Sequence, residues 1–434
     1  MVLTYKFLNF ISNILKRPVS SGLFYCVFFL TLDDIMPAEP RYQIEKIEIL
    51  GLNKPKHYII EREIFHPVNT SLDSSLANLD RNRIFNLGLF DNVSWRIMPL
   101  ENGNAILQYL MIESINRTPP LMFPAYDEEK GWSLNGVMII KNFQGKNRTI
   151  EAIASIGGEK RLQFLINDPW IFGNHISLSA FIEQNSYDHL FLDRSVNIKN
   201  IKVSIGKWYG EKIKFRFSPS LTSKNFMNEN DTLSYKYLSP EINLEIDTRD
   251  IFWNPTSGTR IIQSVIPKLG EKSFYAWNQS FSFYIPTFFK TVLAFNTTMQ
   301  RKYGHKSDVW ISYLGNSYNV RGWELPEKKS ILDDYRFGHD YVFSSLELRK
   351  LVLNKINGRV GFDNGLCIVA FIDGGLISRE WEDFDRDKFI GGVGLGVRIP
   401  IPILQSLRID VGWGIKDNKL INEHSFHFAV QQKF

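Results

Sequence analysis

The chain has 434 residues, of which 44% are hydrophobic and 22% are charged, a globular composition that excludes intrinsic disorder. The formal net charge of +5 is small for this length, so we attribute it to solubility and expect no nucleic-acid partner. Two cysteines, Cys26 and Cys367, and eight scattered histidines show neither a disulfide framework nor metal-ligand spacing, which excludes a predicted metal site.

Residues 1–38 are predicted to be a signal peptide. Lys16 and Arg17 precede an apolar run from Val19 to Leu32, which is too short for a transmembrane helix. Cleavage is expected after Ala38, and an uncleaved membrane anchor is the alternative. No other segment has 18 consecutive apolar residues, so a membrane protein with this sequence would be a β-barrel.

Residues 41–117 are predicted to form a small α+β domain. A strand at residues 42–50 is followed by a short helix at 58–65 and a second helix that begins near Ser71. Two strands follow, the last at residues 105–113. This β-α-α-β-β order resembles a POTRA domain, the periplasmic module of outer-membrane assembly proteins. The stretch from Asp80 to Val93, with Leu87-Gly-Leu-Phe90 before a strand, is the most specific match.

Residues 118–130 are interpreted as a stiff, proline-containing linker, and residues 131–434 as an all-β transmembrane barrel. Strand-like alternation recurs in sixteen segments of mostly about ten residues, the length that crosses a bilayer as a tilted strand. The predicted strands lie near 131–141, 148–157, 161–167, 174–184, 198–206, 212–221, 237–246, 258–267, 273–285, 290–302, 308–315, 339–349, 366–375, 390–399, 406–415 and 425–434. Fourteen strands is the alternative count.

The last predicted strand carries its apolar residues on one face. These residues are Phe426, Phe428, Val430 and Phe434, whereas Ser425, His427, Gln431 and Lys433 lie on the other face. A strand that is apolar on one side and ends on Phe is similar to the C-terminal signal of outer-membrane barrels. The edge strand of a soluble sandwich is the alternative.

No nucleotide-binding or hydrolase motif is found in the sequence. The run Gly391-Gly-Val-Gly-Leu-Gly396 suggests a phosphate loop only superficially, because it lies inside an alternating strand pattern. Small residues on one strand face are the favoured interpretation. We therefore expect no cofactor, no catalytic residue and no enzymatic activity.

A long segment from Tyr313 to Tyr335 interrupts the strand pattern and carries Val320-Arg321-Gly322-Trp323. Because its composition is apolar and aromatic, we expect it to fold back and bury Arg321. A buried guanidinium requires a carboxylate. Asp373, in Phe371-Ile-Asp-Gly-Gly375, and Glu347 should point into the lumen, since a charge facing lipid is costly, and both are candidate partners.

Four motifs in this order resemble the BamA/TamA superfamily of outer-membrane assembly factors and two-partner secretion transporters. Val320-Arg-Gly-Trp323 matches the motif on the family's loop between strands 11 and 12, and Phe371-x-Asp373-x-Gly375 matches its strand-13 motif. The other two motifs are turns. They are Asp168–Gly173 and the segment that contains Asp247, Arg249, Asp250, Pro255 and Gly258.

The resemblance implies an outer-membrane barrel in a lipid bilayer, with a POTRA-like domain in the periplasm. Its implied role is to insert or translocate unfolded outer-membrane or secreted polypeptides without ATP. The first barrel strand, near residues 131–143, and the sixteenth would pair weakly along a seam that opens sideways. An incoming strand would then add to the open edge by backbone hydrogen bonds, and Lys433 and Phe434 would close the seam. Arg321 would hold the loop in place. A passive pore and an accessory scaffold that recruits a partner are the alternatives.

Overall fold

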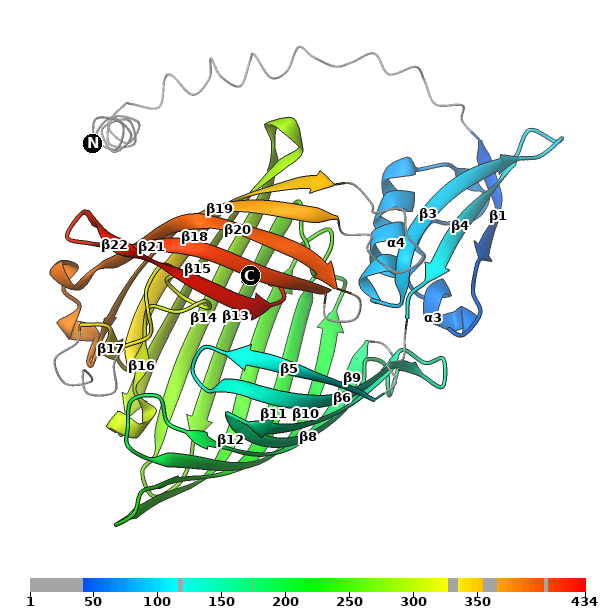
Figure 1. Ribbon diagram of the computed structural model, residues 1–434. Helices are drawn as coiled ribbons and strands as arrows, with labels where there is room; N and C mark the ends of the chain where they lie inside the picture. The colour runs from blue at the N-terminus through cyan, green and yellow to red at the C-terminus, as the bar shows by residue number, and fades with distance from the viewer. Residues whose placement is uncertain (1–41, 116–119, 174, 327–334, 354–364, 402–404) are drawn as a thin grey trace.

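The computed structural model describes residues 42–115, 120–173, 175–326, 335–353, 365–401 and 405–434. The predicted signal peptide lies outside the described residues. The described chain forms a small α+β domain followed by a large, nearly closed β-barrel (Figure 1). Within the described residues, no helix has the length and apolar character needed to cross a membrane.

The small domain contains a four-stranded sheet with two helices. Its elements are β1 (Gln43–Leu50), α3 (His57–Glu61), β2 (Thr70–Ser71), α4 (Ser74–Asn86), β3 (Phe90–Pro99) and β4 (Ala105–Glu113), and the sheet order is β2-β1-β4-β3. Asp73 caps α4 by accepting a hydrogen bond from the Leu76 amide, and Gly88 follows the helix with a φ of +68°. Phe90, which follows this turn, is buried in the core of the domain.

The barrel is a single sheet of sixteen antiparallel strands, which confirms the predicted fold class and strand number. Eleven hairpin-connected strands begin it, and five more complete it. They are β5 (Leu121–Asp127), β6 (Gly131–Phe143), β7 (Arg148–Gly157), β8 (Glu159–Asp168), β9 (Ile176–Asp188), β10 (Ser195–Tyr209), β11 (Ile213–Met227), β12 (Thr232–Asp247), β13 (Gly258–Lys268), β14 (Phe274–Thr287), β15 (Thr291–Gly304), β18 (Asp340–Leu353), β19 (Leu366–Ser378), β20 (Ile390–Ile401), β21 (Gln405–Lys416) and β22 (Lys419–Val430). Each strand pairs with its neighbours in this order, but β5 and β22, at the two edges, form no ladder with each other.

Two strand assignments made from the sequence are wrong, and their errors cancel in the count. The first barrel strand is β5, inside the stretch interpreted as a linker, so the seam lies between β5 and β22 and not at β6. Pro124 favoured the linker interpretation, because proline lacks the N–H that a central strand needs for pairing. An edge strand tolerates proline, since it has no neighbour on one side. Residues 308–315, in turn, form η3 (Asp308–Trp310) and the short β16 (Ser312–Tyr313), which pairs with β17 (Phe337–Gly338) and not with the barrel.

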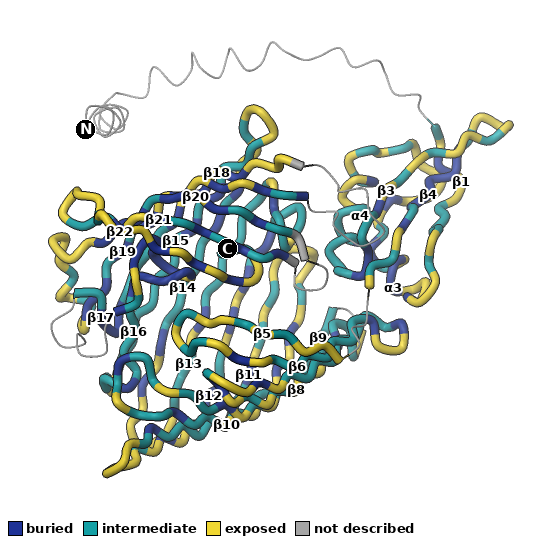
Figure 2. Tube along the Cα trace, viewed as in Figure 1, coloured by how far each residue is buried: buried dark blue, intermediate teal, exposed yellow. Residues whose placement is uncertain are grey.

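More exposed and more buried residues alternate along many of the barrel strands (Figure 2), as expected when successive side chains face the outer surface and the lumen in turn. On β22, Phe426, Phe428 and Val430 are 57%, 45% and 45% exposed and face outward, as the strand pattern predicts. Phe434 does not share this face. The strand ends at Val430, Gln431 adopts a φ of +72°, and the last residues turn into the lumen.

The small domain contacts the turns at one end of the barrel, which we call the domain end. The Lys56 amide donates to Gly145 O at 3.0 Å in the β6–β7 turn. The Asn86 side chain donates to Asp250 O and accepts from the Phe252 amide, both at 3.0 Å, in the β12–β13 turn. Arg62 lies 4.0 Å from the ring centre of Trp170, in the β8–β9 turn. Three separate turns therefore hold the domain beside the barrel.

The two predicted turn motifs lie at the domain end. Arg249 forms an ion pair with Asp247 at 2.6 Å, and Asp250 accepts hydrogen bonds from the Thr256 and Ser257 amides across the turn. Gly258 has a φ of +102°, and a side chain there would overlap the backbone of Thr248. Pro255, between them, is buried. In the other motif, Asp168 accepts a hydrogen bond from Arg148 at 2.5 Å.

In the part of the chain that the structure describes, three further short 3₁₀ helices lie outside the strands. They are η2 (Phe288–Lys290), η4 (Trp381–Asp383) and η5 (Arg386–Lys388). The last two belong to the loop between β19 and β20, on the side of the barrel opposite the domain end. None of the three contributes to the candidate site.

Candidate functional site

Residues 314–326, which follow β16, fold into the lumen, where their backbone is shaped by two asparagines. Asn316 Oδ1 accepts from the Tyr318 and Asn319 amides, and Asn319 Oδ1 accepts from the Gly315 amide at 2.7 Å. These Asx-type turns replace the ladder hydrogen bonds that the loop lacks. Val320 and Arg321 are completely buried as a result.

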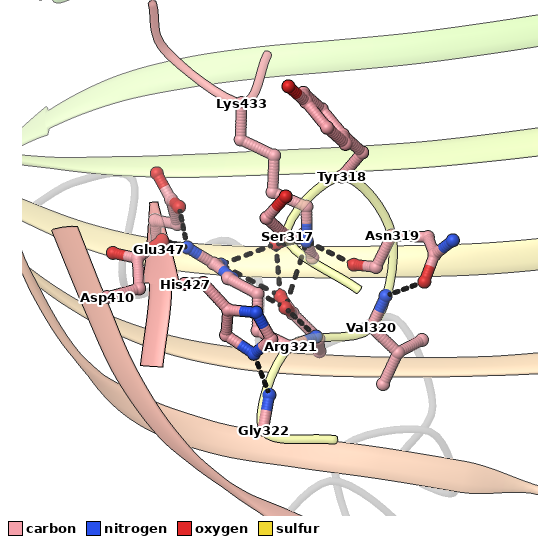
Figure 3. Close-up of polar contacts among 12 residues, drawn as sticks. Ser317, Tyr318, Asn319, Val320, Arg321, Gly322, Glu347, Asp410, His427 and Lys433 are labelled. Atoms are coloured by element: carbon pink, nitrogen blue, oxygen red, sulfur yellow. Dashed lines mark hydrogen bonds and ion pairs between the residues drawn. The ribbon is translucent and has the colours of Figure 1, made fainter. Parts of the chain in front are cut away.

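Arg321 is the centre of the site, and the structure brings it to both carboxylates expected from the sequence, Asp373 and Glu347. Figure 3 shows Arg321 beside Glu347. Its Nε and Nη2 lie 2.7 and 2.9 Å from the two oxygens of Asp373, and its own amide donates to Asp373 at 3.0 Å. Nη1 lies 2.7 Å from Glu347 Oε1. The guanidinium also stacks 3.6 Å above the ring centre of Phe371. A planar fork that uses every N–H is a geometry that lysine cannot reproduce.

Sequence reasoning missed a third carboxylate and most of the surrounding cations. Asp410, on β21, lies 3.1 Å from Arg321 Nη1, and Ser345 accepts a hydrogen bond from Nη2 at 3.1 Å. Arg398 bridges Asp410 and Glu347 at 2.5 and 3.3 Å, and Arg349 pairs with Glu347 at 2.8 Å. The alternation of Arg408-Ile-Asp410 along β21 indicates that Asp410 faces the lumen, but it does not indicate that the loop lies against this strand.

Glycines on β20 and β21 form the floor on which the loop lies. An added Cβ at Gly392 would overlap the carbonyl oxygen of Arg321, and one at Gly412 would lie 3.1 Å from Gly322 Cα. At Gly414 it would lie 3.0 Å from the Trp323 side chain. The small residues that the sequence placed on one strand face therefore make room for the loop backbone.

The other predicted loop residues fit around this floor. Trp323 Nε1 donates to Gly391 O at 2.7 Å, and Val320 packs in a buried cluster with Leu314. Gly375 supplies no side chain to Arg321. A side chain there would lie 2.9 Å from Leu314 Cδ1, so this glycine makes space for the apolar part of the loop.

The C-terminal tail enters the same site, which corrects the expectation that Lys433 and Phe434 close the seam. Lys433 Nζ lies 2.9 Å from Asp373 Oδ2 and also donates to Asn319 O (Figure 3). Arg349 donates to Phe434 O at 3.3 Å and lies 4.9 Å from the centre of its ring. The Asp373 carboxylate holds the Lys433 ammonium in the lumen, and Arg349 holds Phe434, whereas a lysine at a lipid-facing strand end would be costly.

Side chains connect the seam edges to the loop. His427, on β22, accepts the Gly322 amide on Nε2 at 2.9 Å, so the proton of the neutral imidazole lies on Nδ1. Nδ1 lies 3.0 Å from Glu128, in the turn between β5 and β6, and the other Glu128 oxygen accepts from the Ser317 amide. In that turn, burial raises the pKa of the Glu129 carboxyl, which accepts a hydrogen bond from Tyr313. The two edges thus meet through side chains, both directly and by way of the loop, and not through a backbone ladder.

The remaining predicted residues lie away from this site. Phe426, Phe428 and Val430 lie on the outer surface of β22. The turn that contains Asp247, Arg249, Asp250, Pro255 and Gly258 lies at the domain end. The described residues hold no group of three or more His, Cys, Asp or Glu side chains placed to bind a metal ion.

A family model described as the Omp85 superfamily domain matches residues 142–434. Among solved structures, BamA from Haemophilus ducreyi lacking POTRA domains 1–3 aligns with a TM-score of 0.57 and 16% identity, over 90% of this chain and 84% of that one. CdiB from Acinetobacter baumannii aligns with a TM-score of 0.54 and 12% identity, over 90% and 74% of the two chains. CdiB from Escherichia coli gives 0.53 and 12%, over 92% of both. A search of curated proteins gives no match.

The first prediction concerns the coupling between Arg321 and Asp373. Each single alanine substitution should lower the free energy of unfolding by about 3–5 kcal/mol, because it leaves a buried charge without its partner. The double substitution should cost little more than either single one. Denaturant unfolding of the detergent-solubilised barrel measures all three variants. Additive losses would exclude the pairing, and Arg301→Ala, which removes an exposed pair with Glu382, should cost about 1 kcal/mol or less.

A second prediction tests the glycine floor with two adjacent positions. Gly392→Ala should displace the loop backbone, because its methyl group would overlap the Arg321 carbonyl. Gly391→Ala is the matched control, since its nearest neighbour would be Ile415 Cβ at 3.2 Å, away from the loop. Proteolysis of the folded barrel should cut the loop faster in Gly392→Ala alone. Equal cleavage of the two variants would mean that the loop does not rest on this face.

Proposed function

Because this chain belongs to the Omp85 superfamily, we propose that it inserts or translocates polypeptides at an outer membrane, without ATP, through the seam between β5 and β22. Members of this superfamily are non-enzymatic assembly and translocation factors, in agreement with the absence of catalytic motifs from the sequence. The observation that carries the proposal is the seam. Fifteen neighbouring strand pairs form ladders in the described sheet, whereas β5 and β22 form none.

The outer surface of the barrel is apolar and contacts the lipid bilayer in this proposal. The small domain would serve as the POTRA-like module on the periplasmic side, so the domain end of the barrel faces the periplasm. The contacts of Lys56, Arg62 and Asn86 with three barrel turns support a fixed orientation of the domain beneath the lumen. Unfolded outer-membrane or secreted polypeptides would approach from this side.

The free edge of β5 is the proposed template. An extended client segment can add to it by backbone hydrogen bonds, as in β-augmentation. β5 spans only seven residues, and Pro124 cannot donate a hydrogen bond, so a strand paired to this edge is held weakly. Gly131 and Gly136 lie on β6, the next strand, and add flexibility there. Weak pairing is useful at an edge that must release its client.

We define Val320–Trp323 as the loop latch. In this proposal it makes the β22 side of the seam rigid. Arg321 connects β18, β19 and β21 through Glu347, Asp373 and Asp410. Its role in this proposal is to hold the loop and these strands as one unit while β5 and its neighbours move. It acts by position and takes part in no bond-making step.

Depletion of the protein tests the function. If the chain assembles or translocates polypeptides, depletion should lower the amount of a subset of outer-membrane or secreted proteins severalfold, and the wild-type chain should restore them. Quantitative proteomics of outer-membrane and culture fractions measures this. A passive pore is the alternative, supported by the polar lumen face of the middle strands. Liposome swelling with unchanged proteomes would establish the pore and exclude the assembly role.

Locking the seam tests the mechanism. Cysteines introduced at Glu128 and His427, in a Cys367→Ser background, would lie on opposite edges where the native side chains touch at 3.0 Å. A short bifunctional thiol reagent should join the edges and abolish complementation of the depleted cells, because the client could no longer enter between them. The two single-cysteine variants, treated with the same reagent, are the control for the substitutions. Full complementation by the crosslinked barrel would exclude the seam as the site of action.

A further inference from the structure

The strands β10 to β15 form the part of the barrel wall that lies across from the seam, since β5 and β22 are the two ends of the strand order. The register of these strands places one set of alternating residues in the lumen. Basic residues outnumber acidic ones in that set. The basic residues are Lys202, Lys214, Arg216, Lys224, Arg260, Lys268 and Lys302, and the acidic residues are Glu241, Glu245 and Asp247.

The acidic residues of this wall are already engaged. Glu241 pairs with Lys202 at 2.7 Å, Glu245 pairs with Arg260 at 2.7 Å, and Asp247 pairs with Arg249 in the adjoining turn. Within the described part of the chain, Lys214, Arg216, Lys224 and Lys268 have no carboxylate at ion-pair distance. The Lys302 ammonium donates to the Trp310 carbonyl oxygen at 2.6 Å. Four positive charges on this wall therefore remain with neither a carboxylate at ion-pair distance nor a hydrogen-bond partner among the described residues.

Two of these cations form cation–π contacts with aromatic rings and no ion pair with a carboxylate. Lys224 Nζ lies 4.4 Å from the ring centre of Trp310 and 4.8 Å from that of Phe226. Lys214 Nζ lies 5.1 Å from the ring centre of Trp208. A ring face lowers the cost of holding a cation in a confined space but leaves its net charge intact. Lys224 is also close enough to Lys268 and Lys302 for mutual repulsion.

The four cations are spread along the wall. Lys214 and Arg216 lie near the domain end of β11, where its turn from β10 adjoins the small domain, and Lys224 lies near the other end of the same strand. Lys268 closes β13 at that other end. Ten residues of a strand separate Lys214 from Lys224, which corresponds to roughly 30 Å of chain. A single small anion occupies one point, whereas an extended acidic chain could contact the whole row.

We propose that this wall is an electropositive track that receives carboxylate-rich segments of the polypeptides that the barrel handles. Uncompensated cations that line a narrow passage with low-dielectric walls raise the local concentration of anions. The track would draw acidic segments into the lumen from the domain end and keep them on the wall facing the seam. This inference rests on the proposed function and specifies the chemistry of its substrate.

Charged thiol reagents measure the field directly and require no assembly activity. A cysteine at Thr222, on the lumen face of β11 beside Lys224, is the reporter in a Cys367→Ser background. An anionic methanethiosulfonate should modify it roughly tenfold faster than a cationic one, relative to the same two reagents at an exposed cysteine placed at Asn230. Equal relative rates would overturn the proposal. A reporter that neither reagent reaches would overturn it as well, because a track must be open to solvent.

Paired substitutions assign the field to the named residues. Lys224→Gln with Lys268→Gln should reduce the rate preference at the reporter to near unity. Lys199→Gln with Lys236→Gln is the matched control, because these two lysines lie on the outward faces of β10 and β12 and are exposed. If both pairs have the same effect, the preference arises from overall charge and the track is excluded.

A protection assay distinguishes an acidic chain from a small anion. A ten-residue glutamate peptide should slow modification of the Thr222→Cys reporter at least severalfold, whereas acetate at the same carboxylate concentration should not. Equal protection by acetate would mean that the wall binds small anions only, and it would overturn the proposed binding of acidic segments. The proposed function is tested separately, by depletion. A strong anion preference with unchanged proteomes would overturn the assembly role and leave the field intact, and the converse result would overturn the track alone.

Discussion

The burial of the Arg321 guanidinium is the constraint on which the rest of the site depends. A guanidinium removed from water requires acceptors for all of its N–H groups. Here they come from Glu347, Asp373 and Asp410 on three strands, together with the Ser345 hydroxyl. Those strands must therefore keep a fixed register. The loop backbone must also approach the wall closely, and this explains why glycines occupy the floor beneath it. One buried charge thus determines the register, the small residues and the path of the loop.

The two sides of the seam are held by different means. On one side, β18 to β22 are joined by the loop latch and by the C-terminal tail, whose Lys433 shares Asp373 with Arg321. On the other side, β5 is short, has Pro124 in its middle and carries no buried ion-pair network. Contact between the sides passes through Glu128 and His427. A rigid edge beside a loosely held edge is an arrangement suited to opening at one defined place.

The sequence allowed much of this to be predicted, for physical reasons that also explain the failures. The Arg321–Asp373 pair could be predicted because burial, charge and strand face all limit the possible partners. Asp410 could not, since alternation gives the face of a residue but not which strands a loop will cross. Pro124 made an edge strand resemble a linker, and Trp310 made a loop resemble a strand. Phe434 was placed on the wrong side because a strand pattern does not reveal that Gln431 ends it with a positive φ.

The charge balance of the lumen connects the latch with the wall opposite the seam. Around Arg321, the cations Arg349, Arg398, Arg408 and Lys433 exceed the three carboxylates, so the latch side is itself positive. The loop is therefore held by short, local contacts with its carboxylates and not by the overall field, which repels it. An acidic client segment entering the lumen would meet the opposite situation. The positive charge of both walls attracts an acidic segment. The carboxylates beside Arg321, however, already neutralise the nearby cations and repel further acidic groups. The cations on β11 and β13 that have no carboxylate partner are therefore the sites that can bind it.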